Sequence, residues 1–201
     1  MQIPAVILVR EGSKRLPQKW ALPWMGTTLV RWACAQVLQC EHVSGLVLAT
    51  DSQAIIDNVH GVKPAMGSME VFKDSVSATL ARHWSRFESI KRPPVPDEQT
   101  SLSGLRWVQD ALGLTASYVM LCQATSPFIN PEDLSRLVLC ADLPCRSFVA
   151  LGARQRPTVQ GYIVPPFITD ATVKAWVEQD APDVDVDTQS DYERALTLCQ
   201  R

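Results

Sequence analysis

Residues 3–19 read IPAVILVREGSKRLPQK, an apolar run that passes directly into a basic loop with one glycine. The apolar part, residues 3–9, is short, continuous and rich in branched side chains, which is typical of a strand buried on both faces of a parallel sheet. In α/β proteins the loops that follow such strands bind ligands. The opening of the chain therefore predicts a central strand followed by a ligand-binding loop.

The same alternation of buried strands and amphipathic helices continues to the end of the chain. Further strands are expected at residues 46–49, 87–90, 118–122, 147–151 and 161–164. Helices are expected at residues 29–38, 52–59, 74–84, 101–112, 131–140, 170–177 and 190–199. Residues 91–100 hold three prolines and are expected to form a loop. Strands alternating with helices predict a Rossmann-like α/β fold in three layers, α/β/α, around a mostly parallel, mixed sheet.

Composition narrows the class of protein. The 201 residues suffice for one sizeable core and are too few for two ordinary domains, so we expect a single domain over residues 1–201. A formal net charge of -2 does not indicate a nucleic-acid or membrane surface, and no apolar run is long enough to span a bilayer. None of the six cysteines forms a Cys-x-x-Cys pair, so we expect free thiols and a cytoplasmic location.

The loop at residues 10–19 is a candidate phosphate-binding loop. It carries four basic residues, which are Arg10, Lys14, Arg15 and Lys19. Gly12 allows the backbone to approach a ligand closely, and consecutive N–H groups in such a loop can form an anion-binding nest. The spacing differs from the GxxxxGK[ST] loop of other nucleotide-binding proteins. A solvated basic turn is the alternative interpretation.

Two further segments carry candidate site residues. Residues 183–187 read DVDVD, and strict alternation places Asp183, Asp185 and Asp187 on one face of an extended segment. Carboxylates gathered in this way suit Mg²⁺ that also binds phosphate oxygens, whereas the alternative is an acidic surface strand before a capped helix. Residues 123–127, QATSP, follow a buried strand, and the Gln123 amide suits sugar hydroxyls unless the segment is only a turn.

These pieces, in this order, resemble the acylneuraminate cytidylyltransferases, the CMP-sialic acid synthetase family. The family's opening motif A-R-x-x-S-K-x-L/I-P-x-K-N is similar to VREGSKRLPQKW at residues 9–20, and its S/A-T-D is similar to ATD at 49–51. Its R-P, acidic stretch and S-S-x-x-G resemble parts of residues 92–104. Its L-Q-P-T-S-P-L-R is similar to LCQATSPF at 121–128, and its I-D-I-D-T-x-x-D-L resembles VDVDTQSDY at 184–192. The resemblance spans nearly the whole chain.

The resemblance implies a fold of the nucleotidyltransferase type and a loop that binds CTP. In that arrangement Arg10, Lys14 and Lys19 surround the phosphates, and the backbone of Gly12 and Ser13 lies beneath them. The partners implied are CTP, or another nucleoside triphosphate, and a small acidic sugar. A homodimer is also implied as a possibility.

The resemblance also assigns the base, the metal and the reaction. Arg92 and Ser101 are expected to contact the cytosine, and Asp185 and Asp187 are expected to hold the cofactor Mg²⁺ against the triphosphate. The anomeric hydroxyl of a sialic-acid-like sugar then attacks the α-phosphorus, and pyrophosphate leaves.

In that reaction Arg10, Lys19 and Asp187 are the expected catalytic residues, and their task is positioning and charge stabilisation. Gln123 and Thr125 are expected to face the sugar.

Three departures from the family's pattern bear on specificity. Trp20 stands where the family has Asn, and its indole could stack on a base or block the pocket. Residues 128–129 are Phe-Ile in place of Leu-Arg. Residues 150–166 are short where the family carries a sugar-binding and dimerisation insertion. The alternatives are a related nucleotidyltransferase with another nucleotide or acceptor, and a catalytically silent nucleotide-binding protein.

Overall fold

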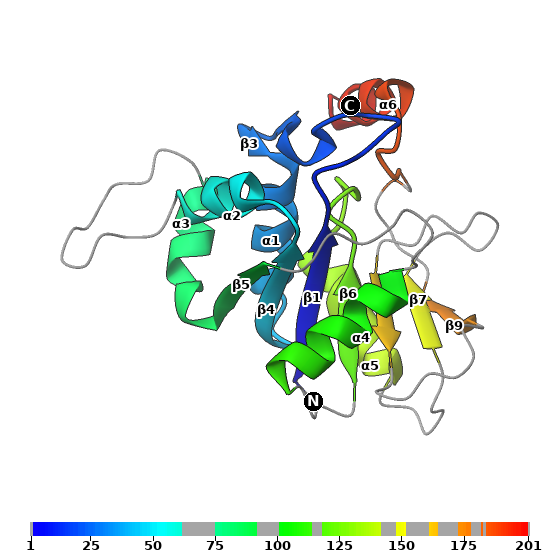
Figure 1. Cartoon of the computed structure of the whole chain (residues 1–201). Coiled ribbons are helices and arrows are strands. Elements are labelled where there is room, and N and C mark those ends of the chain that lie inside the picture. The colour runs from blue at the N-terminus through cyan, green and yellow to red at the C-terminus, as the bar shows by residue number, and fades with distance from the viewer. Residues whose placement is uncertain are drawn as a thin grey trace.

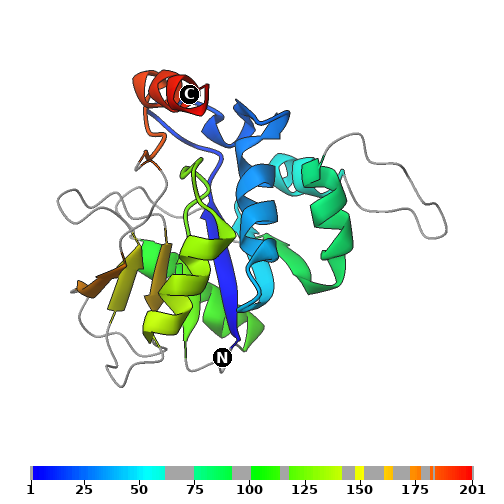
Figure 2. The ribbon, with the colours of Figure 1, turned by 180° about the vertical axis from the view of Figure 1, so that it is seen from behind.

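Strand β1 (Ile3–Val9) lies inside a sheet that has helices on both faces (Figures 1 and 2). The computed structural model describes residues 2–61, 75–91, 101–113, 118–141, 148–151, 161–164, 173–177, 182 and 184–200. Within these residues seven strands form one sheet in the order β5-β4-β1-β6-β8-β7-β9. The three-layer, mostly parallel α/β fold expected from the sequence is confirmed.

The strand order reverses at β1, which has β4 and β5 on one side and the later strands on the other. The other strands are β4 (Val43–Thr50), β5 (Phe87–Lys91), β6 (Val119–Cys122), β7 (Phe148–Leu151), β8 (Gly161–Val164) and β9 (Val173–Val177). β1 pairs in parallel with β4 on one side and with β6 on the other, and in the described sheet only β8 runs antiparallel to its neighbours. The carboxyl ends of β1 and β6 thus meet at a switch point, where α/β proteins place their ligands.

Helices cover the two faces of the sheet unequally. α1 (Leu29–Gln39), α2 (Gln53–His60), α3 (Ser75–Arg82) and α5 (Pro131–Ala141) belong to one face, and α4 (Ser101–Leu112) covers the other. Figure 1 has α4 in front of the strands, and Figure 2 has α1 and α5 in front. None of the described helices combines the length and apolar character needed to cross a membrane.

The side chains of β1 alternate between two cores, as a strand buried on both faces requires. Ala5 and Ile7 belong to the larger core with residues of α1 and α5, such as Cys34 and Leu137. Val6 points the other way, into the smaller core beneath α4. The continuous apolar run at the start of the chain is therefore explained by burial of both faces.

A third core cluster lies beyond the carboxyl end of β1 and fastens α6 (Gln189–Cys199) there. It includes Leu16 from the basic loop and Val184 and Val186 from the acidic segment. Tyr192 on α6 also donates a hydrogen bond of 2.5 Å to the carbonyl oxygen of Pro23. Apolar residues interspersed among the charged ones thus bring the basic and acidic segments together (Figures 1 and 2).

The expected helix at residues 170–177 is wrong. Residues Val173–Val177 form strand β9, which pairs in parallel with β7. Val173, Ala175 and Val177 alternate with the residues between them, so the segment carries a period of two as well as helix-forming residues. Pairing with β7 supplies the tertiary contact that makes this segment a strand and not a helix, because β propensity depends strongly on context.

The remaining expected helices and strands are confirmed, with shifts at their ends. The helix expected at 74–84 ends at Arg82, and a short 3-10 helix, η2 (Trp84–Arg86), follows it. A small hairpin of β2 (Pro23–Trp24) and β3 (Thr27–Thr28) was not expected from the sequence. Residues 92–100, in the expected proline-rich loop, lie outside the described residues.

Candidate active site

Three segments meet beyond the carboxyl ends of β1 and β6. They are the basic loop at residues 10–19, the turn at 123–127 and the acidic segment at 184–187. The backbone N–H of Val186 donates a hydrogen bond of 2.8 Å to the carbonyl oxygen of Thr125, which ties the acidic segment to the turn. The indole N–H of Trp32 on α1 donates to the carbonyl oxygen of Pro127 at 2.8 Å and holds the turn from the other side.

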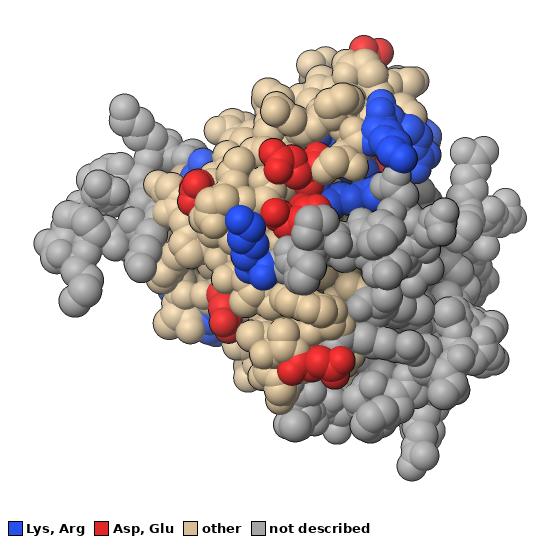
Figure 3. Space-filling model, in the orientation of Figure 1, with Lys and Arg blue, Asp and Glu red and all other residues tan. Residues whose placement is uncertain are grey.

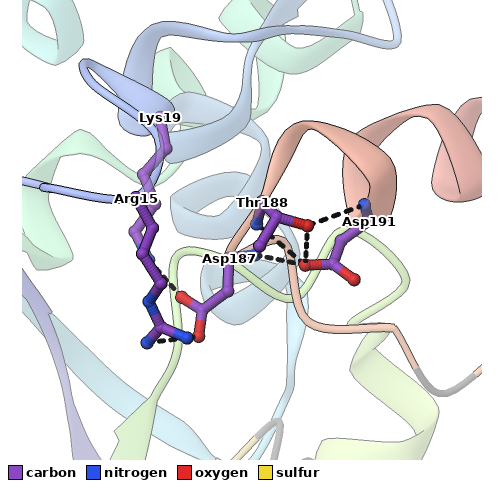
Figure 4. A network of polar contacts seen from close by, with 5 residues as sticks. All are labelled: Arg15, Lys19, Asp187, Thr188 and Asp191. Atoms are coloured by element: carbon purple, nitrogen blue, oxygen red, sulfur yellow. Dashed lines mark hydrogen bonds and ion pairs between the residues drawn. The ribbon is translucent and has the colours of Figure 1, made fainter.

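The basic and acidic segments make direct ion pairs (Figure 4). Lys19 Nζ lies 2.7 Å from Asp187 Oδ1, although the two residues are 168 positions apart in the sequence. Arg15 places a guanidinium nitrogen 3.0 Å from Asp187 Oδ2. Lys19 begins the short 3-10 helix η1 (Lys19–Ala21), whereas Arg15 lies in the exposed part of the loop. Both oxygens of one carboxylate are therefore paired with cations from the loop that follows β1.

The start of α6 positions Asp187. Thr188 and Asp191 form a capping box, in which the Thr188 hydroxyl accepts from the Asp191 backbone N–H and the Asp191 carboxylate accepts from the Thr188 N–H at 2.8 Å. The same Asp191 carboxylate oxygen also accepts from the Asp187 backbone N–H at 3.2 Å (Figure 4). The backbone of Asp187, which directly precedes the N-cap residue of α6, is thus fixed by the cap of that helix.

The pKa of Asp191 reflects this cap. Burial by itself raises the pKa of the carboxyl, but hydrogen bonds from the Thr188 hydroxyl and from the Thr188 and Asp187 backbone N–H groups outweigh burial. The net effect lowers the pKa of Asp191, and Arg194 contributes to the lowering. The carboxylate form is therefore the one that the folded protein stabilises.

Asp185 lies in a different environment. Its side chain is half-buried, and its Oδ1 atom is buried without a hydrogen-bond partner among the residues that the structure describes. Burial raises the pKa of this carboxyl, a hydrogen bond from the Thr125 side chain opposes that rise, and the neighbouring Asp187 carboxylate adds to it. A buried carboxylate oxygen without a partner is costly, so it indicates a site for a cation.

A divalent cation fits these residues if a nucleotide supplies the remaining ligands. The described residues contain no group of three or more His, Cys, Asp or Glu side chains that could enclose a metal by themselves. Mg²⁺ commonly binds through one or two carboxylates together with water and phosphate oxygens. The pair Asp185 and Asp187 matches that donor set, and the unpartnered Asp185 oxygen is the observation that supports the fit.

The front of the basic loop is anchored by Asp51, at the end of β4. The Glu11 backbone N–H donates to Asp51 Oδ1 at 3.0 Å, and the Ser13 N–H donates to the Glu11 carbonyl oxygen at 3.0 Å. No described atom lies within 4 Å of the point that a Cβ on Gly12 would take. Two backbone donors of the loop are thus already engaged within the protein.

Charges of both signs gather on this face of the molecule. Figure 3 shows basic and acidic side chains next to one another in the upper part of the view, below α6. Arg10 and Lys14 are exposed in the loop. A ligand with several negative charges therefore meets cations beside the two site carboxylates.

The structure brings some of the predicted site residues together and leaves others undescribed. Lys19 forms an ion pair with Asp187, and the Asp185 carboxyl has a hydrogen bond with Thr125 and is near enough to Asp187 and Lys19 to feel their charges. Gln123 is half-buried at the start of the turn, where its carbonyl oxygen accepts from the Ser126 N–H at 3.4 Å.

The two residues expected to contact the cytosine are not fully described. Arg92 lies outside the described residues, and so does Asp183 of the acidic segment. Ser101 begins α4, and its side chain is outside the described part. Their proposed roles stay predictions.

Trp20 lies in the core of the protein and not at the surface of the site. Its side chain is 9% exposed and belongs to the larger core cluster with residues of α1. Stacking of Trp20 on a nucleotide base therefore does not match its position. The indole instead packs in the core, where η1 lies against α1.

Sequence reasoning missed three residues that shape the site. Arg15 was counted as a basic loop residue without a role, and Asp51 and Asp191 were not assigned to the site. A signal existed for Asp191, because Thr188-x-x-Asp191 has the spacing of a capping box. The pairing of Arg15 with Asp187 and of Asp51 with the Glu11 N–H depends on contacts across the fold.

Comparisons with known proteins concern the family and the fold of this chain. Residues 5–93 match the protein-family model described as Cytidylyltransferase. This cytidylyltransferase match covers β1, the basic loop and the strands β4 and β5, and it ends before the turn at 123–127 and the acidic segment. No curated protein sequence is significantly similar to the chain.

Several solved structures have a similar fold. A CMP:2-keto-3-deoxy-manno-octonic acid synthetase complexed with CTP has a TM-score of 0.70 at 16% identity, covering 100% of this chain and 99% of that one. A 4-diphosphocytidyl-2C-methyl-D-erythritol synthase from Anaerococcus prevotii has a TM-score of 0.66 at 12% identity, covering 100% and 97%. Rv0371c from Mycobacterium tuberculosis, in complex with manganese, has a TM-score of 0.63 at 18% identity, covering 98% and 99%. At these identities the likeness establishes the fold.

Proposed function

We propose that this protein is a magnesium-dependent cytidylyltransferase, which transfers CMP from CTP to an acidic sugar and releases pyrophosphate. The observation that carries the proposal is the meeting of Lys19 and Arg15 with Asp187, next to the unpartnered Asp185 oxygen. Cations for phosphates and carboxylates for a divalent ion then lie side by side at the switch point of the sheet. The cytidylyltransferase match over residues 5–93 supports CTP as the nucleotide.

In this proposal the basic loop binds the triphosphate. Of the two loop cations that pair with Asp187, Lys19 is less exposed than Arg15, with 20% of its side chain accessible to solvent. The Lys19 charge is therefore poorly solvated and interacts more strongly with phosphates. Lys14 and Arg10 surround the phosphates, and the backbone of Gly12 and Ser13 lies beneath them. Arg92 and Ser101 contact the cytosine. Because the protein contributes positioning and charge stabilisation, Arg10 and Lys19 act on the leaving pyrophosphate.

Asp185 and Asp187 would hold the divalent ion in this arrangement, and Asp187 counts with the catalytic residues. When bound, Mg²⁺ neutralises charge on the phosphates and orients them for in-line displacement. The hydrogen bond from Thr125 keeps the Asp185 carboxylate oriented, and the cap of α6 does the same for Asp187. The manganese complex of Rv0371c supports the use of a divalent ion in this fold.

The acceptor in this proposal is a sialic-acid-like sugar, whose anomeric hydroxyl attacks the α-phosphorus. Gln123 and Thr125 face that sugar from the turn after β6. The similar structure of a synthetase that acts with 2-keto-3-deoxy-manno-octonic acid supports an acidic sugar. Since the cytidylyltransferase match ends at residue 93, a related nucleotidyltransferase with another nucleotide or acceptor is the second candidate. The sequence at residues 150–166 is also shorter than in the family that the chain resembles, which supports this second candidate.

The unpartnered oxygen of Asp185 favours an active enzyme over a silent nucleotide-binding protein. A protein that only binds nucleotide has no need to keep a buried carboxylate beside a second one, because the pair is destabilising without a cation.

We also propose that the protein acts as a homodimer in the cytoplasm. The free, buried thiols of Cys34, Cys40 and Cys122 agree with a reducing compartment.

A pyrophosphate-release assay tests this function. The protein is incubated with Mg²⁺ and each nucleoside triphosphate in turn, together with sialic acid, 2-keto-3-deoxy-manno-octonic acid or a neutral sugar. Release that requires CTP, Mg²⁺ and an acidic sugar is the expected result. Release with another nucleotide or with neutral sugars would support the second candidate. Nucleotide binding by calorimetry without release from any combination would show a silent binding protein.

A further inference from the structure

The Asp187 carboxylate is fully occupied by the protein's own cations. Lys19 Nζ lies 2.7 Å from one oxygen, and an Arg15 guanidinium nitrogen lies 3.0 Å from the other. Its neighbour Asp185 differs, because one of its carboxylate oxygens is buried without a hydrogen-bond partner among the described residues. The short acidic segment therefore holds one carboxylate that is paired on both oxygens, Asp187 (Figure 4), and one with an unpartnered oxygen, Asp185.

A divalent ion that arrives alone meets unfavourable conditions. Coordination by Asp187 requires displacement of at least one of its ion pairs, and the ion then lies close to the displaced positive charge. The described residues offer no third carboxylate, histidine or cysteine to complete a metal site. Since Asp187 is already paired with two cations, it and Asp185 together are a poor site for a dication that brings no other ligands.

A polyphosphate removes both obstacles. It offers negative oxygens to Arg15 and Lys19, so these cations can leave Asp187 without losing an anionic partner. Arg15 is well suited to such a transfer, because 71% of its side chain is exposed and an exposed ion pair is weak. The same phosphates complete the coordination of a metal that the two carboxylates begin.

We propose that Arg15 is a positioning residue that keeps metal off Asp187 until a nucleotide polyphosphate takes the guanidinium over. This inference rests on the proposed function. It makes nucleotide and metal binding cooperative. The nucleotide phosphates draw the cations away from Asp187 and coordinate the metal, and the metal neutralises charge on the phosphates. By thermodynamic linkage the metal strengthens nucleotide binding by the same factor as the nucleotide strengthens metal binding.

The substitution Arg15→Gln separates this role from a merely structural one. Binding of Mn²⁺ alone, without any nucleotide, is measured from the electron paramagnetic resonance signal of the free ion. Binding of CTP alone is measured by calorimetry in the presence of a chelator. The expected result for the variant is Mn²⁺ binding that is about two- to fivefold tighter and CTP binding that is weaker by a similar factor, as loss of an exposed pair implies.

Effects of opposite sign are the signature, because a variant with a damaged fold would bind both ligands less well. Arg194→Gln is the matched control, since Arg194 is exposed on α6, carries the same charge and faces Asp191 instead of Asp187. Its Mn²⁺ affinity should equal that of the wild type, and Arg15→Lys should also stay close to the wild type.

Two results would overturn the inference in distinguishable ways. If the wild type binds CTP and Mn²⁺ but Arg15→Gln leaves Mn²⁺ affinity unchanged or weakens it, Arg15 does not exclude the metal. If the wild-type protein binds neither CTP nor Mn²⁺ in the presence of the other, the proposed function fails and this inference fails with it.

Discussion

Two aspartates two positions apart differ in almost every physical respect. Asp187 is one-third exposed, is paired with Lys19 and Arg15, and donates its backbone N–H to the Asp191 carboxylate of the α6 cap. Asp185 is more buried, and its pKa is raised chiefly by that burial. The alternation of buried valines with the aspartates produces this contrast, because Val184 and Val186 fix the segment in the core. At the scale of single residues, environment sets the role of each carboxylate.

Replacement of Asp187 tests the metal assignment. Asp187→Asn should lower Mg²⁺-dependent pyrophosphate release about a hundredfold or more, because removal of a charged metal ligand costs several kcal/mol of transition-state stabilisation. The free energy of unfolding in urea should change by less than about 1 kcal/mol, since the ion pairs are partly exposed. Asp110→Asn, on the exposed surface of α4, is the control with the same chemical change. Full turnover in Asp187→Asn would contradict the metal assignment.

At the scale of elements, the start of α6 and the packing of α4 against β1 matter most. The capping box of Thr188 and Asp191 supplies acceptors for backbone donors at the first turn of α6 and holds Asp187 in place. On the other side of the sheet, Gly104 of α4 lies against Leu8 of β1. Both features show how a few residues set the position of a whole helix relative to the site.

The cap of α6 predicts a pH-dependent contribution to stability. The pKa of Asp191 is lowered in the folded protein, so its stabilising effect is complete above the ordinary value of 3.8 and is lost as the pH falls through the lower folded value. Asp191→Asn should therefore lower the thermal unfolding midpoint by about 2–4 °C at pH 7, the effect of about 1 kcal/mol in a chain of this size.

The measurement is a series of thermal unfolding curves for both proteins between pH 7 and pH 3. The difference between the two midpoints should be constant down to about pH 4 and should shrink in more acidic buffer, where Asp191 of the wild type becomes protonated. A difference that grows on acidification would contradict the direction of the pKa shift.

The approach of α4 to β1 predicts a size limit at Gly104. A Cβ at this position would lie 2.9 Å from Leu8 Cδ1, the flexible end of that side chain. Gly104→Ala should be tolerated within about 1 kcal/mol, because the gain in helix propensity offsets a small shift of Leu8.

A larger side chain has no such compensation. Gly104→Leu should destabilise the protein by about 1–3 kcal/mol in urea unfolding, as overpacking does. Ala111→Leu places the same side chain on an exposed position of α4 and should change stability by less than about 0.5 kcal/mol. Equal stability of Gly104→Leu and the wild type would show that α4 is free to move away from β1.

At the scale of the whole molecule, three hydrophobic cores hold different elements together. The larger core joins β1, β4 and β6 to α1, α2, α3 and α5, and the smaller core joins the same strands to α4. The third core, around Leu16, Trp24 and Val186, attaches α6 and the hairpin to the end of the sheet. The first two cores therefore pack the helices onto the sheet, and the third packs the basic loop against the acidic segment at the site.

The cores predict which thiols react in the native protein. Burial raises the pKa of Cys34 to about 12 and raises the pKa of Cys122 as well, so neither forms a thiolate near neutral pH. Cys199 is exposed at the end of α6. Iodoacetamide at pH 8 should modify Cys199 in the native protein and should modify Cys34 and Cys122 only in denaturant. Mapping by mass spectrometry reports each cysteine separately, and rapid labelling of Cys34 in the native state would contradict the described core.

Local patterns in the sequence were sufficient to predict most of the fold and part of the site. The buried strands at residues 3–9 and 118–122 are recognisable because both faces are covered by helices, which requires uninterrupted apolar residues. The basic loop and the acidic segment are visible because charged residues cluster within a few positions. In the acidic segment the valines that alternate with the aspartates, Val184 and Val186, are buried in the structure.

Other features were decided only by tertiary structure. Residues 173–177 form a strand because β7 offers them a partner, and no local pattern contains that information. Trp20 is buried because α1 packs against η1, although its position in the loop suggested a ligand contact. The sequence by itself therefore determined which segments are strands, loops and charged clusters, through periodicity and composition. Tertiary structure decided that Arg15 and Lys19 meet Asp187, because contacts between residues far apart in the chain depend on the packing of the whole molecule.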